Sequence, residues 1–144
     1  MKDITRRILE DGEPVWFVCD TGKQMHRKLG IWDADPYEFE QLYGFELGLD
    51  KEARLRYHQT AMTHAMLFTG VDVTDKGIRR WRVENSWGEK ESGKSGFYTM
   101  NDSWFDEYMF EIAAPTSYLN EKMVAGLETE PVVLPAWDPM GSLA

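Results

Sequence analysis

The residues from Met62 to Gly88 constrain the fold more than any other stretch, because they read as two strands joined by a tight turn. The segment from His64 to Val73 is rich in strand-forming side chains, and Thr74-Asp75-Lys76-Gly77 supplies turn chemistry. Charged and apolar side chains then alternate from Ile78 to Asn85. This pattern predicts an antiparallel hairpin with its open end near His64.

The register of this hairpin brings two polar side chains together. Folding symmetrically about the turn places Asn85 across from Met66, one diagonal step from His64, where side chains can touch. An imidazole bonded to a side-chain amide is held in one tautomer and orientation, as a general base requires. Trp87 follows directly and is placed to shield that bond from water. The alternative is that His64 is an ordinary residue at a strand end.

The same residues resemble the His and Asn segments of papain-like cysteine peptidases. In detail they are similar to one branch, the bleomycin hydrolase and bacterial aminopeptidase C family. The resemblance covers nearly the whole chain, and its ending is highly specific. The matching segments are Val15-Trp16-Phe17, Cys19-Asp20, Thr63-His64-Ala65, the run from Trp81 to Gly88, Gly96-Phe97-Tyr98, Glu130-Pro131 and the run from Leu134 to Gly141.

The resemblance implies a fold and an activity. The fold is α+β, the C-terminal antiparallel-sheet half-barrel domain of a papain-like peptidase with short helices, spanning residues 1–130. Residues 131–144 form a C-terminal arm expected to lie in the active-site cleft. The activity is that of a cysteine aminopeptidase, which releases N-terminal residues from peptides. The relatives assemble as rings, so a homo-oligomer is also implied.

The resemblance further assigns roles to four residues. His64 is the general base of a Cys-His-Asn triad, Asn85 orients it, and Trp87 supports the pair. The terminal carboxylate of Ala144 binds the free amino group of the peptide substrate. A single carboxylate suits that task, because binding the ammonium fixes how many residues precede the scissile bond.

The nucleophile is the missing part of the pattern. The family uses a Cys at a helix start followed by Trp, with a Gln upstream, and this sequence holds no such segment. Cys19 precedes His64 by about 45 residues, whereas a papain-type nucleophile lies about 130–150 residues upstream. We therefore expect a C-terminal part that is inactive without its N-terminal catalytic segment. We expect Cys19 to be a small buried or half-buried residue at a strand end, whose neighbour Asp20 disfavours a thiolate.

Two other functions remain open. In one, the chain is a stand-alone, non-catalytic binding or assembly module derived from this domain. In the other, weaker reading, Cys19 is itself catalytic, which requires its thiol to lie within hydrogen-bond reach of His64.

Composition excludes several function classes. A length of 144 residues suits one domain, and the net charge of −9 argues against nucleic-acid binding. One cysteine allows no internal disulfide and fits a reducing, cytoplasmic setting. No apolar run approaches the roughly 20 residues of a membrane span. One Cys and three scattered His show no metal-ligand spacing, and we expect no cofactor.

The rest of the chain predicts short elements around the hairpin. We expect the apolar run Val15–Cys19 to be a strand covered on both faces, and residues 21–35 to be a loop. We expect a helix from Pro36 to Tyr43, capped by Asp35, whose aromatic side chains pack on the sheet. Further helices are predicted near residues 4–9, 51–58, 101–108 and 120–127, and further strands at 97–100 and 109–113.

Overall fold

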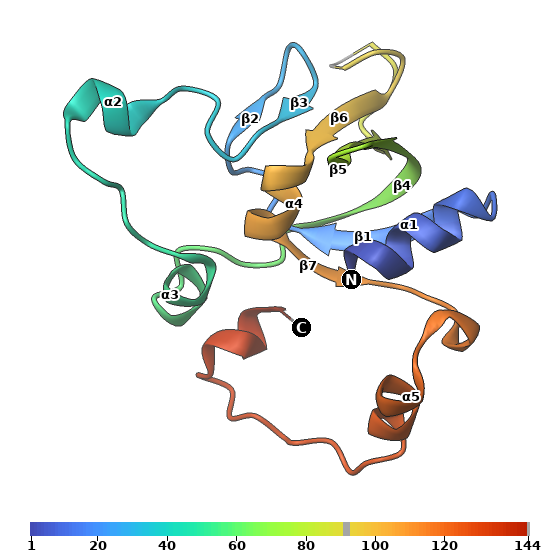
Figure 1. Ribbon diagram of the computed structural model, residues 1–144. Helices are drawn as coiled ribbons and strands as arrows, with labels where there is room; N and C mark the ends of the chain where they lie inside the picture. Colours follow the sequence, from blue (N-terminus) through green and yellow to red (C-terminus); the bar gives the residue numbers. More distant parts are fainter. Residues whose placement is uncertain (91–92, 144) are drawn as a thin grey trace.

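The computed structural model describes residues 1–90 and 93–143 (Figure 1). One seven-stranded sheet runs in the order β2-β3-β6-β5-β4-β1-β7. Its strands are β1 (Val15–Cys19), β2 (Met25–His26), β3 (Ile31–Trp32), β4 (His64–Thr74), β5 (Gly77–Glu84), β6 (Phe97–Asn101) and β7 (Met109–Ile112). The helices are α1 (Lys2–Glu10), α2 (Phe39–Tyr43), α3 (Lys51–Arg56), α4 (Asp102–Tyr108) and α5 (Glu121–Leu127), with short 3-10 turns at η1 (Thr116–Tyr118) and η2 (Pro139–Leu143). The predicted α+β class is confirmed.

The long hairpin β4–β5 forms as predicted, with two irregularities that cancel. Leu67 pairs with Glu84, which places Asn85 level with Met66 beyond the last pair. The ladder shifts once between Phe68 and Gly70 and once between Asp72 and Val73. The first shift adds a residue to β4 and the second adds one to β5. The register at the open end is therefore that of a regular hairpin.

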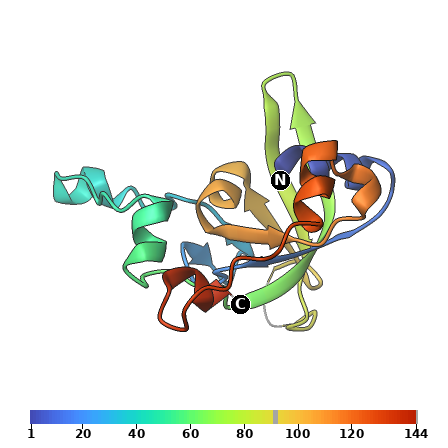
Figure 2. The ribbon, with the colours of Figure 1, turned by 90° about the horizontal axis from the view of Figure 1, so that it is seen from below.

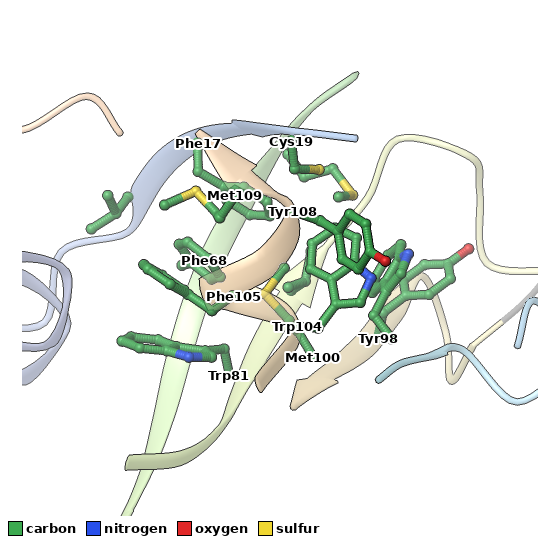
Figure 3. Packing of buried hydrophobic residues seen from close by; sticks show 14 of the residues in the cluster. Phe17, Cys19, Phe68, Trp81, Tyr98, Met100, Trp104, Phe105, Tyr108 and Met109 are labelled. Atoms are coloured by element: carbon green, nitrogen blue, oxygen red, sulfur yellow. The ribbon is translucent and has the colours of Figure 1, made fainter. Parts of the chain in front are cut away.

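The core lies on one face of this curled sheet and is built mainly from aromatic rings (Figure 3). Phe68 of β4 is fully buried and stacks on Phe17 of β1 with ring centroids 3.8 Å apart. On its other sides it contacts Trp81 at 5.2 Å and Phe105 of α4 at 5.7 Å. Alternation along each strand sends these residues to one face, and α4 covers them.

Polar contacts fasten α1 and α3 to α4 beside the core. The Nζ atom of Lys2 lies 2.7 Å from carboxylate oxygens of both Asp102 and Asp106. Asp102 also accepts a hydrogen bond from the indole N–H of Trp81, at 3.1 Å. Buried Arg54 of α3 donates to the backbone and the carboxylate of Glu107. α4 is thus fixed from both sides.

Two sequence expectations about the sheet are wrong. β1 alternates instead of being covered on both faces, since Val15, Phe17 and Cys19 are buried while Trp16 is 58% exposed. Residues 21–35 contain the short strands β2 and β3, and β3 pairs with β6 in parallel. These two-residue strands are too short to show a periodicity. Tertiary pairing with β6 decides their conformation.

The segment after β3 also departs from the prediction. α2 begins at Phe39, after Glu38 in a left-handed conformation, and Asp35 accepts only a local bond from the Glu38 N–H. The segment projects away from the sheet in both ribbon views (Figures 1 and 2). Its apolar side chains are exposed instead of packed on the sheet: Tyr37, Leu42, Tyr43, Phe45, Leu47 and Leu49. A solvent-facing apolar run of this kind is typical of an interaction surface.

The C-terminal residues leave the sheet after β7 and pass through η1 and α5. α5 forms within the predicted range of residues 120–127, and Asn120 caps it by accepting from the N–H of Met123 at 2.9 Å. The chain then returns beneath β7 to place η2 near α3 (Figure 1). Val133 is 91% exposed and Trp137 is 77% exposed, so the stretch of the arm before η2 makes little contact with its own domain. No helix within the described ranges is long and apolar enough to cross a bilayer.

We expect Phe68→Ala to lower the free energy of unfolding by about 3–5 kcal/mol, because it removes a ring at the centre of the aromatic stack. Urea titration followed by circular dichroism measures this loss. The exposed Val133→Ala serves as the matched control and should shift stability by less than about 0.5 kcal/mol. Equal unfolding midpoints for the two variants would contradict this packing.

We expect the Cys19 thiol to be unreactive in the folded chain. Burial raises its pKa, and the Asp20 carboxylate raises it further, so the thiol stays protonated at pH 8, where an exposed cysteine reacts readily. A disulfide reagent should label the native chain very slowly and the urea-unfolded chain at once. In a Cys19→Ala background, Ser117→Cys gives an exposed thiol as the positive control. Rapid labelling of Cys19 in the native chain would contradict this prediction, because it would show that solvent and reagent reach the thiol.

Candidate functional site

The predicted pair of His64 and Asn85 meets at the open end of the β4–β5 hairpin. The Nε2 atom of His64, the first residue of β4, lies 2.9 Å from Oδ1 of Asn85, which directly follows β5. Asn85 is only 8% exposed. Its backbone N–H donates to the Gly96 carbonyl at 3.2 Å, which ties the residue to the start of β6. Strand pairing therefore fixes the positions of both side chains.

The tautomer of His64 follows from the chemistry of its partner. The backbone N–H of Ser86 donates to Oδ1 of Asn85 at 2.8 Å. Because that N–H can only donate, the atom facing it must be the carboxamide oxygen, which in turn can only accept. The Nε2 atom of neutral His64 must then carry the proton. The lone pair is left on Nδ1, free to accept a proton from another group.

Trp87 lies against His64 as the sequence suggests. The two rings are stacked, with centroids 5.2 Å apart and planes at 26°. The indole also meets the ring of Tyr98 edge-on, at 6.1 Å and 88°. It is half-buried. Such a ring keeps bulk water from one side of the imidazole and so strengthens the bond to Asn85.

Arg27 is a neighbour of this site that the sequence did not reveal. Its guanidinium carbon lies 5.3 Å from the centroid of the Trp87 ring. Arg27 comes from the turn between β2 and β3, a region predicted as loop. Only the pairing of that hairpin with β6 brings it to the site, so no local sequence pattern marks it.

One polar atom of the site lacks a partner. The Nδ2 group of Asn85 is buried, and no acceptor lies within reach among the described residues. A buried donor left unpaired costs about 1–3 kcal/mol, so most such groups in folded proteins find an acceptor.

Cys19 lies nearer to His64 than the sequence suggests, but in an unreactive setting. The two residues are paired directly across β1 and β4. The Cys19 thiol donates to the backbone oxygen of His64 at 3.8 Å, and the side chain is fully buried. Burial raises the pKa of this thiol, which opposes a thiolate. The expected strand-end role of Cys19 is confirmed.

The remaining site predictions concern Ala144 and metals. Ala144 lies outside the described residues. Within residues 1–90 and 93–143, no three His, Cys, Asp or Glu side chains gather as a metal site would need. A groove of about 680 Å³ lies over the exposed face of β4, β5 and β6, between Gly70, Arg82 and Thr99. It contains neither His64 nor Asn85.

Comparisons with known proteins match the whole chain. The model of the Peptidase C1-like family matches residues 1–141. Aminopeptidase C of Listeria innocua is 42% identical over 144 residues, and human bleomycin hydrolase is 45% identical over 148. Each alignment covers 100% of this chain but only 32% of the relative, so the chain spans about a third of their length.

A solved structure agrees with these matches. The crystal structure of PepW from Lactobacillus rhamnosis is 39% identical and superposes with a TM-score of 0.90, covering 99% of this chain and 32% of that one. The papain-like half-barrel fold expected from the resemblance is confirmed. On the match to its model over residues 1–141, the chain belongs to the Peptidase C1-like family, in the region that it shares with aminopeptidase C and bleomycin hydrolase.

Proposed function

We propose that this chain is the C-terminal, base-carrying part of a cysteine aminopeptidase acting on peptides with a free N-terminus. The observation that carries the proposal is the His64–Asn85 bond of 2.9 Å, with its tautomer fixed by the Ser86 N–H. The relatives named aminopeptidase C and bleomycin hydrolase support the reaction class. Peptide hydrolysis of this type needs no metal or cofactor.

In the proposed mechanism the nucleophile is a Cys outside this sequence. The Nδ1 atom of His64 takes the thiol proton, and Asn85 holds the resulting imidazolium in place through Nε2. The thiolate attacks the peptide carbonyl, and the imidazolium returns its proton to the leaving amine. Water, deprotonated by His64, then hydrolyses the acyl-enzyme. Alone, the chain has a base without a nucleophile and is inactive.

The unpaired Nδ2 group of Asn85 supports the proposal that another part of the enzyme completes this site. A buried donor calls for an acceptor, and none lies near it among the described residues. An oxygen from the remaining two-thirds of the enzyme would satisfy it. The exposed apolar side chains of residues 37–49 likewise suit a surface that other parts of the protein cover.

We further propose that residues 131–144 reach into the cleft of the complete enzyme. The arm's exposure, with Val133 91% exposed, supports a partner surface beyond its own domain. There the terminal carboxylate of Ala144 would pair with the substrate ammonium. Trp87 would screen the base. We also propose a cytoplasmic setting, which the single buried cysteine supports. We propose that the enzyme is a homo-oligomer, which the exposed apolar segment of residues 37–49 supports.

A second candidate is a non-catalytic assembly module derived from the same domain. The exposed apolar segment of residues 37–49 favours this reading, because such a surface serves association without chemistry. The two functions differ in whether His64 matters for any activity.

A chimera tests the proposal. This chain replaces the equivalent third of Listeria innocua aminopeptidase C, to which it is 42% identical throughout. We expect hydrolysis of an aminoacyl fluorogenic amide, and His64→Ala should lower kcat/KM by at least about 10²–10⁴-fold, since it removes the general base. Asn85→Ala should cause a smaller loss. His58→Ala, at an exposed histidine, is the matched control and should leave the rate unchanged.

Two outcomes would contradict this reading. A folded chimera that binds an acyl analogue but never hydrolyses the amide would favour the assembly module. A chimera that keeps its rate after His64→Ala would place the base elsewhere.

Lengthening the C-terminus tests whether the Ala144 carboxylate binds the substrate ammonium. Adding two glycines after Ala144 in the chimera moves the carboxylate away from its proposed position. We expect KM for the aminoacyl amide to rise at least tenfold while cleavage of an N-acetylated peptide becomes detectable, because the substrate ammonium loses its anchor. An Asp138→Asn chimera, changed at the only other anion of the arm, should behave as the parent. Unchanged kinetics in the extended chimera would remove Ala144 from substrate binding.

A further inference from the structure

We propose that Arg27 is a positioning residue of the candidate site, holding the Trp87 ring over His64 so that water is kept from the His64–Asn85 bond. The inference deepens the proposed function and rests on it for its catalytic meaning. Its physical part, a clamp on the indole, stands on the geometry alone.

Among the described residues, ring or cation–π contacts join the Trp87 indole to three side chains. His64 stacks on it at 5.2 Å, Tyr98 meets it edge-on at 6.1 Å, and the Arg27 guanidinium carbon lies 5.3 Å from its centroid. The Tyr98 ring is buried in the core, so its contact is rigid. Arg27 is exposed at the rim. The indole is therefore held from the core by Tyr98 and from the solvent side by Arg27.

The backbone that carries Arg27 is firmly placed. In the β2–β3 hairpin, the Gly30 N–H donates to the carbonyls of His26 and Arg27 at 3.0 and 3.1 Å. The Leu29 N–H donates to Nδ1 of His26 at 3.3 Å, which closes the turn around Arg27. The Thr99 N–H of β6 then donates to the Gly30 carbonyl at 2.8 Å. Arg27 thus stands on a turn bonded to the strand that carries Tyr98.

A close approach strengthens this placement. Gly30 has a φ of +67° and lies against Gly93, at a spot where any β-carbon would collide with the Gly93 backbone. The hairpin and the loop before β6 therefore meet backbone to backbone. The turn cannot drift from β6 without losing this contact.

The charge of Arg27 explains why an arginine suits the position. A guanidinium is planar and attracted to the negative face of an indole, and it keeps its charge at all working pH values. No ion pair joins Arg27 to an acidic group of the described residues. The cation–π contact with Trp87 is therefore the interaction that the described residues offer to the Arg27 charge.

Losing the Arg27 contact affects the His64–Asn85 hydrogen bond that the Trp87 ring covers. Trp87 is half-buried and has no β-sheet partner, so its ring position depends on side-chain contacts. Losing Arg27 frees the solvent edge of the indole and lets water reach the Nε2–H of His64. In the complete enzyme this would weaken the orientation of the base, and it would lower kcat more than it changes KM.

The test uses the full chain and the variant Arg27→Met, which keeps the length of the side chain and removes its charge. Nuclear magnetic resonance follows the ring C–H signals of His64, which a stacked indole shifts upfield, and the exchange rate of its Nε2–H with water. We expect the upfield shift to shrink and the exchange to quicken at least threefold. Arg27→Lys should lie between the two. Lys28→Met, the same charge change on the next exposed residue, should match the parent.

The outcomes separate the clamp from the proposed function. An unchanged His64 shift and exchange rate in folded Arg27→Met would overturn the clamp, whatever the activity of the chimera. If Arg27→Met shifts the His64 signal but the chimera does not need His64 for activity, Arg27 still positions the Trp87 ring. That positioning then has no role in catalysis. In an active chimera, Arg27→Met should lower kcat with KM nearly constant, and an unchanged kcat would overturn the positioning role.

Discussion

The pairing of β4 with β5 is the interaction on which the rest of the structure depends. It sets the face on which Phe68 and Trp81 enter the core, and it sets the level at which Asn85 leaves the sheet. A slip of one residue would send each of these side chains to the opposite face. The ladder nevertheless contains two irregularities, one on each strand. Because they offset one another, the open end of the hairpin keeps the register that brings His64 to Asn85.

The site also depends on local chemistry that does not involve the sheet. Asn85 and Ser86 are neighbours, and the Ser86 N–H identifies the carboxamide oxygen and fixes its direction. That single bond determines which nitrogen of His64 carries a proton. The sheet therefore supplies the position of the pair, and two adjacent residues supply its chemical state. The lone pair of neutral His64 is left on Nδ1.

Several surfaces of this chain have the properties of an interface whose partner surface is absent: exposed apolar side chains and an unpaired polar group. Residues 37–49 expose six large apolar side chains, and the arm after α5 exposes Val133 and Trp137. The buried Nδ2 donor of Asn85 has no acceptor among the residues that the structure describes. These features are costly in an isolated domain, since apolar surface and unpaired donors both lower stability. They agree with the finding that the chain corresponds to 32% of the relatives it matches.

The sequence by itself determined the central hairpin, the strands β6 and β7, the helices α3 and α5, and the meeting of His64 with Asn85. In each case the signal is local: a turn, a helical periodicity, a two-residue alternation, or a register counted from the turn. The tertiary structure decided the conformation of residues 21–49 and the exposure of β1. β3 forms because β6 offers it a free edge, and β2 forms because it pairs with β3. Trp16 faces solvent because only one face of β1 is covered, and the aromatic residues after Asp35 project because the described residues offer them no covering surface. Arg27 reaches Trp87 only through that non-local pairing, since the two residues are far apart in the chain and share no periodicity.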